Sequence, residues 1–114
     1  MPYIGVRVSV ALTQEKEQVL KEKLGKAIAL LPGKSETWLM VEFTDNCRLY
    51  FQGDGSRPSA FVEVKIFGQA SEADYEKLTT AVTEISSGEL KIDPARIYVK
   101  YEEIATWGWN GQNL

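Results

Sequence analysis

The sequence predicts one domain of the α/β (α+β) class, built from two β-α-β units in tandem. Apolar and polar residues alternate in four segments, and two further segments repeat apolar residues at helical spacing. The two halves align at one constant offset, which pairs Val6 with Val64 and Leu20 with Leu78. Because 114 residues can enclose a core without metals or disulfides, we expect residues 1–114 to form a single domain.

The first unit occupies the first 43 residues. Every second residue from Ile4 to Val10 is apolar, which is the period of a half-buried strand. Thr13 is a suitable helix N-cap, and the following helical stripe ends before Pro32-Gly33 after about five turns. Residues 38–43 alternate again, so we expect a second strand from Trp38 to Phe43.

The second unit repeats this plan. Alternation predicts a strand from Phe61 to Phe67, and Ser71 with Asp74 forms a capping-box pattern ahead of a helical stripe. Apolar residues at alternate positions from Ile97 to Tyr101 indicate the closing strand. Between the two units, RLYFQGDGSRPS contains turn-forming residues and predicts a loop or hairpin.

Composition excludes several classes of function. A net charge of -3 and a pI near 5.0 provide no positive field for a polyanion, so we expect no nucleic-acid partner. The absence of histidine rules out a Ser-His-Asp triad, and the single Cys47 allows no intrachain disulfide. No apolar run is long enough for a membrane span. We expect a cytoplasmic protein, with secretion without a signal peptide as the alternative.

The strand faces turned away from the helices combine charge with aromatic rings. They hold Arg7, Glu42, Glu63, Lys65 and Lys100 among Tyr3, Trp38, Phe61, Phe67 and Tyr98. One interpretation is an antiparallel sheet with one wet face. The interpretation that we favour is self-assembly, in which charges meet at a central space and aromatic rings fill the subunit junctions.

Several motifs together resemble the macrophage migration inhibitory factor branch of the tautomerase superfamily. They are Met1-Pro2, Gly33-Lys34 after the first helix, VEVKIFG, DPARIYVKY and WGWNG, and they cover nearly the whole chain. The resemblance implies the tautomerase fold, a four-stranded mixed sheet with two helices on one face. It also implies a homotrimer with active sites at subunit interfaces, no cofactor, and keto-enol tautomerisation of aromatic 2-oxo acids such as phenylpyruvate.

The same resemblance implies three catalytic residues: Pro2, Lys34 and Tyr98. Removal of Met1 exposes a secondary amine on Pro2, and burial or a nearby cation disfavours the protonated form of such an amine. The free amine can then act as a general base near neutral pH. Lys34 corresponds to the cation that meets the substrate carboxylate, and Tyr98 to a tyrosine contributed by a neighbouring subunit. Without the resemblance, the sequence favours a different role for Lys34, in which it complements the helix dipole near a helix C-terminus.

The resemblance also implies a set of substrate-binding residues. These are Tyr3, Trp38, Phe67, Lys100, Trp107 and Trp109, with Phe67 contributing its backbone amide. Two of these residues depart from the mammalian pattern: Lys100 replaces a neutral amide residue, and Trp107 replaces a smaller aliphatic residue. We therefore expect a narrower and more cationic pocket. Core packing is the alternative role for the tryptophans, Trp109 in particular.

Two other functions remain open. A cytokine-like trimer could bind a receptor or another protein partner and retain only residual tautomerase activity. Dehalogenation or decarboxylation, which other members of the superfamily catalyse, is the weakest alternative, because the arginines that those members use near the proline are not evident in this sequence.

Overall fold

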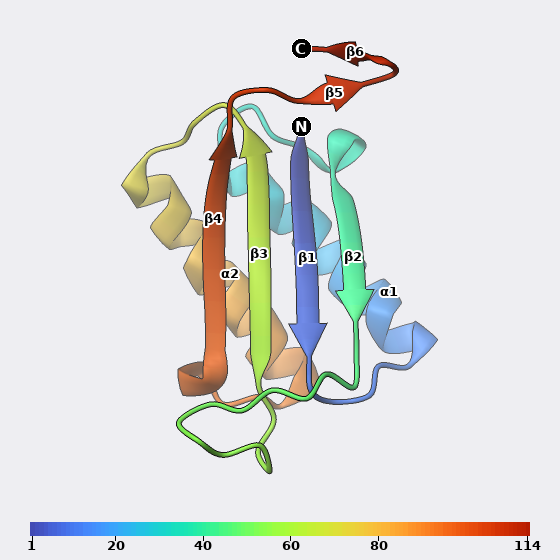
Figure 1. Cartoon of the computed structure of the whole chain (residues 1–114), viewed down its shortest axis with the longest axis vertical. Helices are drawn as coiled ribbons and strands as arrows, with labels where there is room; N and C mark the ends of the chain where they lie inside the picture. The colour runs from blue at the N-terminus through green and yellow to red at the C-terminus, as the bar shows by residue number, and fades with distance from the viewer.

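The computed structural model describes residues 1–114, which form a four-stranded sheet with both long helices on one face (Figure 1). Strand β1 (Pro2–Val8) pairs in parallel with β2 (Met40–Thr44) and antiparallel with β3 (Ala60–Phe67), which pairs in parallel with β4 (Ile97–Ile104). The strand order is therefore β2-β1-β3-β4. The predicted fold class, a mixed sheet of two β-α-β units, is confirmed.

Both helices begin at the predicted N-caps. Ahead of α1 (Gln14–Ala27), the Thr13 hydroxyl accepts a hydrogen bond from the Lys16 amide. Ahead of α2 (Glu72–Leu90), the Ser71 hydroxyl accepts a hydrogen bond from the Asp74 amide. These bonds satisfy backbone N–H groups that have no partner within the helix. Helix α1 tightens into a 3-10 turn, η1 (Ile28–Leu30), before Pro32.

The core lies between the sheet and the helices. Alternate residues of β1 and β3 point into it, as the periodicity predicts, because side chains of a strand alternate between its two faces. The largest fully buried side chains are Ile4, Leu20, Leu24, Ile28, Leu31, Ile66, Leu78, Ile92, Val8, Val62, Val64 and Val82. The other face of the sheet is open in this chain.

Two predicted strand boundaries were wrong. Trp38 does not start a strand, because Glu36–Trp38 forms a 3-10 turn, η2, in which the Leu39 amide bonds to the Glu36 carbonyl. Val10 lies beyond β1, and its carbonyl accepts the Asn46 amide instead of continuing the strand ladder. The alternation of side chains along β2 therefore does not set the direction of the Trp38 side chain.

The loop between β2 and β3 is held by Arg96, which is buried at the start of β4. This residue ends a 3-10 turn, η3 (Pro94–Arg96), capped by the Asp93 carboxylate. Its guanidinium also lies against the Phe51 ring at 5.4 Å. It donates hydrogen bonds to the Ser59 hydroxyl and to the backbone carbonyls of Phe51, Asp54, Arg57 and Pro58. One side chain thus anchors the loop around the isolated antiparallel bridge between Phe51 and Asp54.

The chain ends in a short hairpin that the periodicity did not predict. Its strands are β5 (Gly108–Trp109) and β6 (Gln112–Asn113), joined by Asn110 and Gly111, both with positive φ. An Asn-Gly pair favours this tight turn. In Figure 1 the hairpin lies beyond the N-terminal end of β1. None of the helices combines the length and apolar character that crossing a membrane requires.

Candidate active site

A pocket of about 610 Å³ opens where β1 begins. Four segments distant in sequence meet there: the first residues of the chain, η2 with the start of β2, the middle of β3, and the C-terminal hairpin. The residues lining it are Met1, Pro2, Tyr3, Thr37, Trp38, Leu39, Met40, Lys65, Trp107, Gly108 and Trp109. Of the predicted site residues, Pro2, Tyr3 and all three tryptophans are therefore brought together.

Four aromatic residues contribute to the pocket wall: Tyr3, Trp38, Trp107 and Trp109. Trp38 from η2 and Trp109 from β5 meet edge to face, with ring centroids 5.1 Å apart and planes at 87°. This geometry is favourable for aromatic pairs and keeps the two segments in contact. Each of the two tryptophans remains 48% exposed. The wall is thus available to a flat apolar group.

The polar end of the site is formed by Lys34 and the end of β3. The Phe67 amide donates to the Met1 carbonyl at 3.0 Å, and the Lys34 ammonium donates to the Phe67 carbonyl at 2.8 Å. Gly33, at φ 80°, turns the chain after η1 and so directs Lys34 toward β3. Lys34 therefore lies next to the pocket and does not line it, and Phe67 contributes its backbone.

The electrostatic environment disfavours positive charge at the chain terminus. Burial, followed by repulsion from Lys34, holds the pKa of the Met1 α-amino group below its usual value. Tyr3 behaves differently, because its hydroxyl donates to the Glu42 carboxylate and this bond raises the tyrosine pKa. An amine at this position is thus biased toward its neutral form.

Neither Tyr98 nor Lys100 lines this pocket within one chain, and Tyr98 is far from it. Pro2 is opposite Ile66 and Tyr98 is opposite Phe61, five residues away along β3, which is roughly 16 Å. Tyr98 is 57% exposed and meets the Phe51 ring edge to face at 5.3 Å. The Lys100 ammonium pairs instead with carboxylates of the open sheet face.

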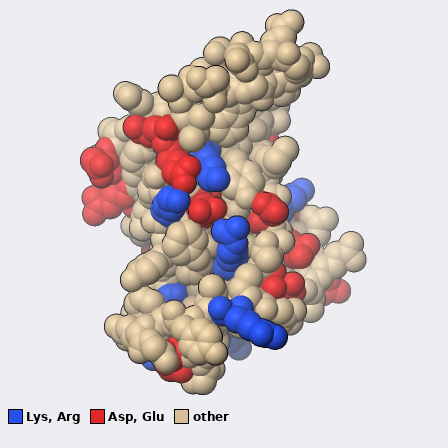
Figure 2. Space-filling model, viewed as in Figure 1, with Lys and Arg blue, Asp and Glu red and all other residues tan.

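The open sheet face carries interleaved charges, as the alternation predicted (Figure 2). Glu63 pairs with Arg7 at 3.4 Å and with Lys100 at 3.6 Å, and Lys100 also pairs with Glu102 at 2.7 Å. These ion pairs link β1, β3 and β4 across the sheet. The face is therefore neither an apolar core nor a uniformly charged surface.

Sequence reasoning missed Lys65 and Met40 as pocket residues. Lys65 precedes Phe67 by two residues, so strand periodicity places both on the open face, and the register sets Lys65 opposite Tyr3. The alternation, which already placed Lys65 on the same face as Phe67, was the signal by which Lys65 could have been found. Met40 follows η2, which the alternation did not reveal.

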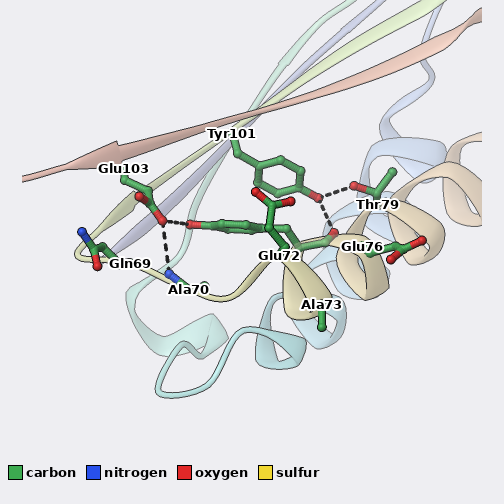
Figure 3. A pocket seen from close by; sticks show the side chains of 9 residues that line it. Gln69, Ala70, Glu72, Ala73, Glu76, Thr79, Tyr101 and Glu103 are labelled. Atoms are coloured by element: carbon green, nitrogen blue, oxygen red, sulfur yellow. Dashed lines mark hydrogen bonds between the residues drawn. The ribbon is translucent and has the colours of Figure 1, made fainter.

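A second, larger hollow lies between the first turns of α2 and the end of β4 (Figure 3). The Glu103 carboxylate accepts hydrogen bonds from the Tyr75 hydroxyl at 2.7 Å and from the Ala70 amide at 3.3 Å. The Tyr101 hydroxyl donates a hydrogen bond to the Tyr75 carbonyl at 3.0 Å. Glu72 and Glu76 add two further carboxylates. This acidic hollow repels organic acids, and no group of acidic or sulfur side chains in the chain is arranged to hold a metal ion.

The mixed four-stranded sheet with two helices on one face is the fold of the tautomerase superfamily. The chain belongs to its macrophage migration inhibitory factor family, because the model of the family described as "Macrophage migration inhibitory factor (MIF)" matches residues 1–114. The predicted resemblance is thus confirmed. Among proteins with curated functions, none matches the chain in sequence.

Solved structures of related proteins agree with this assignment. MIF2 of Leishmania major is 32% identical, with a TM-score of 0.93 over 100% of this chain and 97% of that one. A homologue from Prochlorococcus marinus is 28% identical, with a TM-score of 0.87 over 97% of both chains. The factor from Toxoplasma gondii is 22% identical and shares the fold, with a TM-score of 0.90 over 98% and 99%.

Proposed function

We propose that this protein is a keto-enol tautomerase for aromatic 2-oxo acids such as phenylpyruvate, with Pro2 as the general base once Met1 is removed. The observation that carries the proposal is the position of Pro2. It lies in an aromatic pocket next to an amide donor and an ammonium group. Membership of the family and the superfamily fold support isomerase chemistry in general.

The reaction requires a neutral amine next to a carbon acid. Pro2 is buried, and burial and Lys34 already lower the pKa of the amine one residue earlier. We expect both effects to act on a free Pro2 amine, since each disfavours its protonated form. The amine takes a proton from the carbon beside the substrate carbonyl, and the carbonyl oxygen gains a proton, so that the net change is isomerisation.

Lys34 and the Phe67 amide supply the anchor for the substrate carboxylate. The Met1 carbonyl oxygen, 3.0 Å from the Phe67 nitrogen, marks where an acceptor oxygen fits. Without Met1 that amide has no partner in the chain, and a substrate oxygen can take the same place. The Lys34 ammonium then adds a charge-assisted bond. This arrangement orients the carbon acid toward Pro2.

The complete site requires more than one subunit, and we propose a homotrimer in which Tyr98 enters the pocket of a neighbour. Two observations support this: the roughly 16 Å between Tyr98 and Pro2 along the sheet, and the exposure of the Tyr98 ring. In the neighbour's pocket, the Tyr98 hydroxyl would stabilise the developing enolate oxygen. The mixed open face and the exposed Met40 and Tyr50 supply surface for the subunit contacts.

The decisive experiment is a steady-state assay with phenylpyruvate on protein whose N-terminus is verified by intact mass spectrometry. We expect turnover from protein that begins at Pro2. A stable trimer that begins at Pro2 and gives no turnover would contradict the proposal and favour a cytokine-like binding protein. Full activity in protein that carries Met1 would exclude Pro2 as the base.

A further inference from the structure

Lys65 is the one charged side chain that lines the Pro2 pocket. Strand β3 places it opposite Tyr3, and its ammonium lies 5.6 Å from the centre of the Tyr3 ring, on the open face of the sheet. A contact of this kind holds a lysine against an aromatic wall without neutralising its charge. The ammonium therefore adds a basic group to a pocket whose other lining side chains are apolar, aromatic or neutral.

Lys65 differs from the other basic residues of the open face in having no carboxylate partner. Arg7 and Lys100 both pair with Glu63. The Lys65 ammonium forms no hydrogen bond and no ion pair within 4.0 Å, and the Tyr3 hydroxyl donates to the carboxylate of Glu42. Glu102 lies opposite Lys65 on β4, and Lys65 contributes to lowering the pKa of its carboxyl, but the ion pair of that carboxylate at 2.7 Å is with Lys100. An ammonium at the wall of an organic-acid pocket, with no ion pair of its own within 4.0 Å, is suited to an anion of the ligand.

We propose that Lys65 binds a second anionic group of the substrate, so that the preferred substrates are aromatic 2-oxo acids with a further carboxylate on the ring. This inference rests on the proposed function, which assigns the first carboxylate to Lys34 and the Phe67 amide. Lys65 and Phe67 are two residues apart on one strand, about 6.6 Å, so the two anchors are separated along β3. An aromatic ring lies between them against Trp38 and Trp109, and the carbon acid lies at Pro2.

A binding experiment tests the proposal without turnover. The probes are 4-carboxycinnamate and the methyl ester of its ring carboxylate, and binding is followed by fluorescence of the three pocket tryptophans. In the wild-type protein the diacid binds about fivefold more tightly than the ester, as expected for one partly screened ion pair. Lys65→Gln removes this preference, and Lys65→Arg keeps most of it.

Lys26→Gln is the matched control, because it removes the same charge from the exposed side of α1. It leaves the preference for the diacid intact. No preference in the wild-type protein, or an unchanged preference in Lys65→Gln, would overturn the proposal. Sedimentation of each variant shows whether assembly is altered. If Lys65→Gln alters assembly, the proposal is tested by the preference for the diacid in the wild-type protein and in Lys65→Arg.

The kinetics separate this inference from the proposed function. With phenylpyruvate and its 4-carboxy derivative as substrates, Lys65→Gln raises KM for the derivative about fivefold more than KM for phenylpyruvate. Preferential diacid binding in a protein without turnover would contradict the tautomerase function and leave the second anion site standing. Turnover with equal KM changes for both substrates would contradict the role of Lys65 alone.

Discussion

The amide nitrogen of Phe67 donates a hydrogen bond to the carbonyl oxygen of Met1, with 3.0 Å between the two atoms. That carbonyl belongs to the peptide bond that acylates the nitrogen of Pro2. The same group therefore blocks both the proposed base and the amide that would bind the substrate. Removal of Met1 would therefore free the Pro2 nitrogen and the Phe67 amide together.

Retention of Met1 is expected to abolish catalysis. The lone pair of an acylated proline nitrogen is delocalised into the carbonyl, so it cannot accept a proton. A variant with Ala inserted between Met1 and Pro2 should lose at least about 100-fold in kcat, the usual contribution of a general base. It should keep its assembly state and its thermal stability, because the added residue lies at the pocket and not in the core. Intact mass, sedimentation and phenylpyruvate kinetics check this.

Pro2→Gly provides the comparison, because processing leaves a free primary amine at the same position. This variant should lose less activity than the insertion variant, since only basicity and positioning change. If the insertion and Pro2→Gly proved equally inactive, basicity of a terminal amine would not account for catalysis.

Lys34 should control both the pH dependence and the preference for acids. We expect the wild-type rate to rise with pH as the Pro2 amine loses its proton. We also expect Lys34 to lower the midpoint, because after burial it is the second cause that lowers the pKa of the Met1 α-amino group one residue earlier. Lys34→Ala should move this midpoint upward and weaken turnover of 2-oxo acids far more than that of their esters. A pH profile with each substrate measures both effects. Equal losses for acid and ester, with an unmoved midpoint, would make Lys34 structural.

Mixed trimers should reveal whether Tyr98 acts on the pocket of a neighbour. The insertion variant lacks a competent base, and Tyr98→Ala lacks the tyrosine, so each alone is nearly inactive. After the two are unfolded together in equal amounts and refolded, about one quarter of the sites combine an intact Pro2 with an intact Tyr98 from different chains. Recovery of activity near that fraction is expected. If both residues served the pocket of their own chain, mixing would restore nothing.

Arg96 should be essential for stability because it is buried and has five hydrogen-bond acceptors. Arg96→Lys cannot satisfy the loop carbonyls and should lower the free energy of unfolding by about 3 kcal/mol. Arg57→Lys is the control, since Arg57 forms an exposed pair with Asp93 at 3.0 Å and should cost less than about 1 kcal/mol. Urea unfolding of both variants makes the comparison, and equal losses would show that the loop does not depend on Arg96.

Tyr75 should make the fold sensitive to alkaline pH. Burial, together with the hydrogen bond to Glu103, raises the pKa of Tyr75 to about 12. Because the folded value exceeds the ordinary tyrosine pKa near 10, this stabilisation is complete below pH 10 and is lost as the pH rises toward 12. The free energy of unfolding should fall more steeply between these values in the wild type than in Tyr75→Phe. Parallel profiles would contradict the role of this hydroxyl.

Periodicity was sufficient for most of the fold. The alternation in β1 and β3 and the capping residues Thr13 and Ser71 act within a few neighbouring residues, so they can be recognised without knowledge of the rest of the chain. Trp38 was misassigned because a 3-10 turn precedes β2, and short turns have no period long enough to detect. The same limit hid the hairpin that carries Trp109.

By itself the sequence determined the two β-α-β units, the apolar face of each strand and the candidates Pro2, Lys34 and Tyr98, because these follow from local pattern or motif. Only the tertiary structure decided which of them meet. The pairing of β1 with β3 brings the Met1 carbonyl to the Phe67 amide and Lys65 to Tyr3, and the same register leaves Tyr98 at the opposite end of the sheet. Register is set by packing across the whole sheet, so no local pattern contains it.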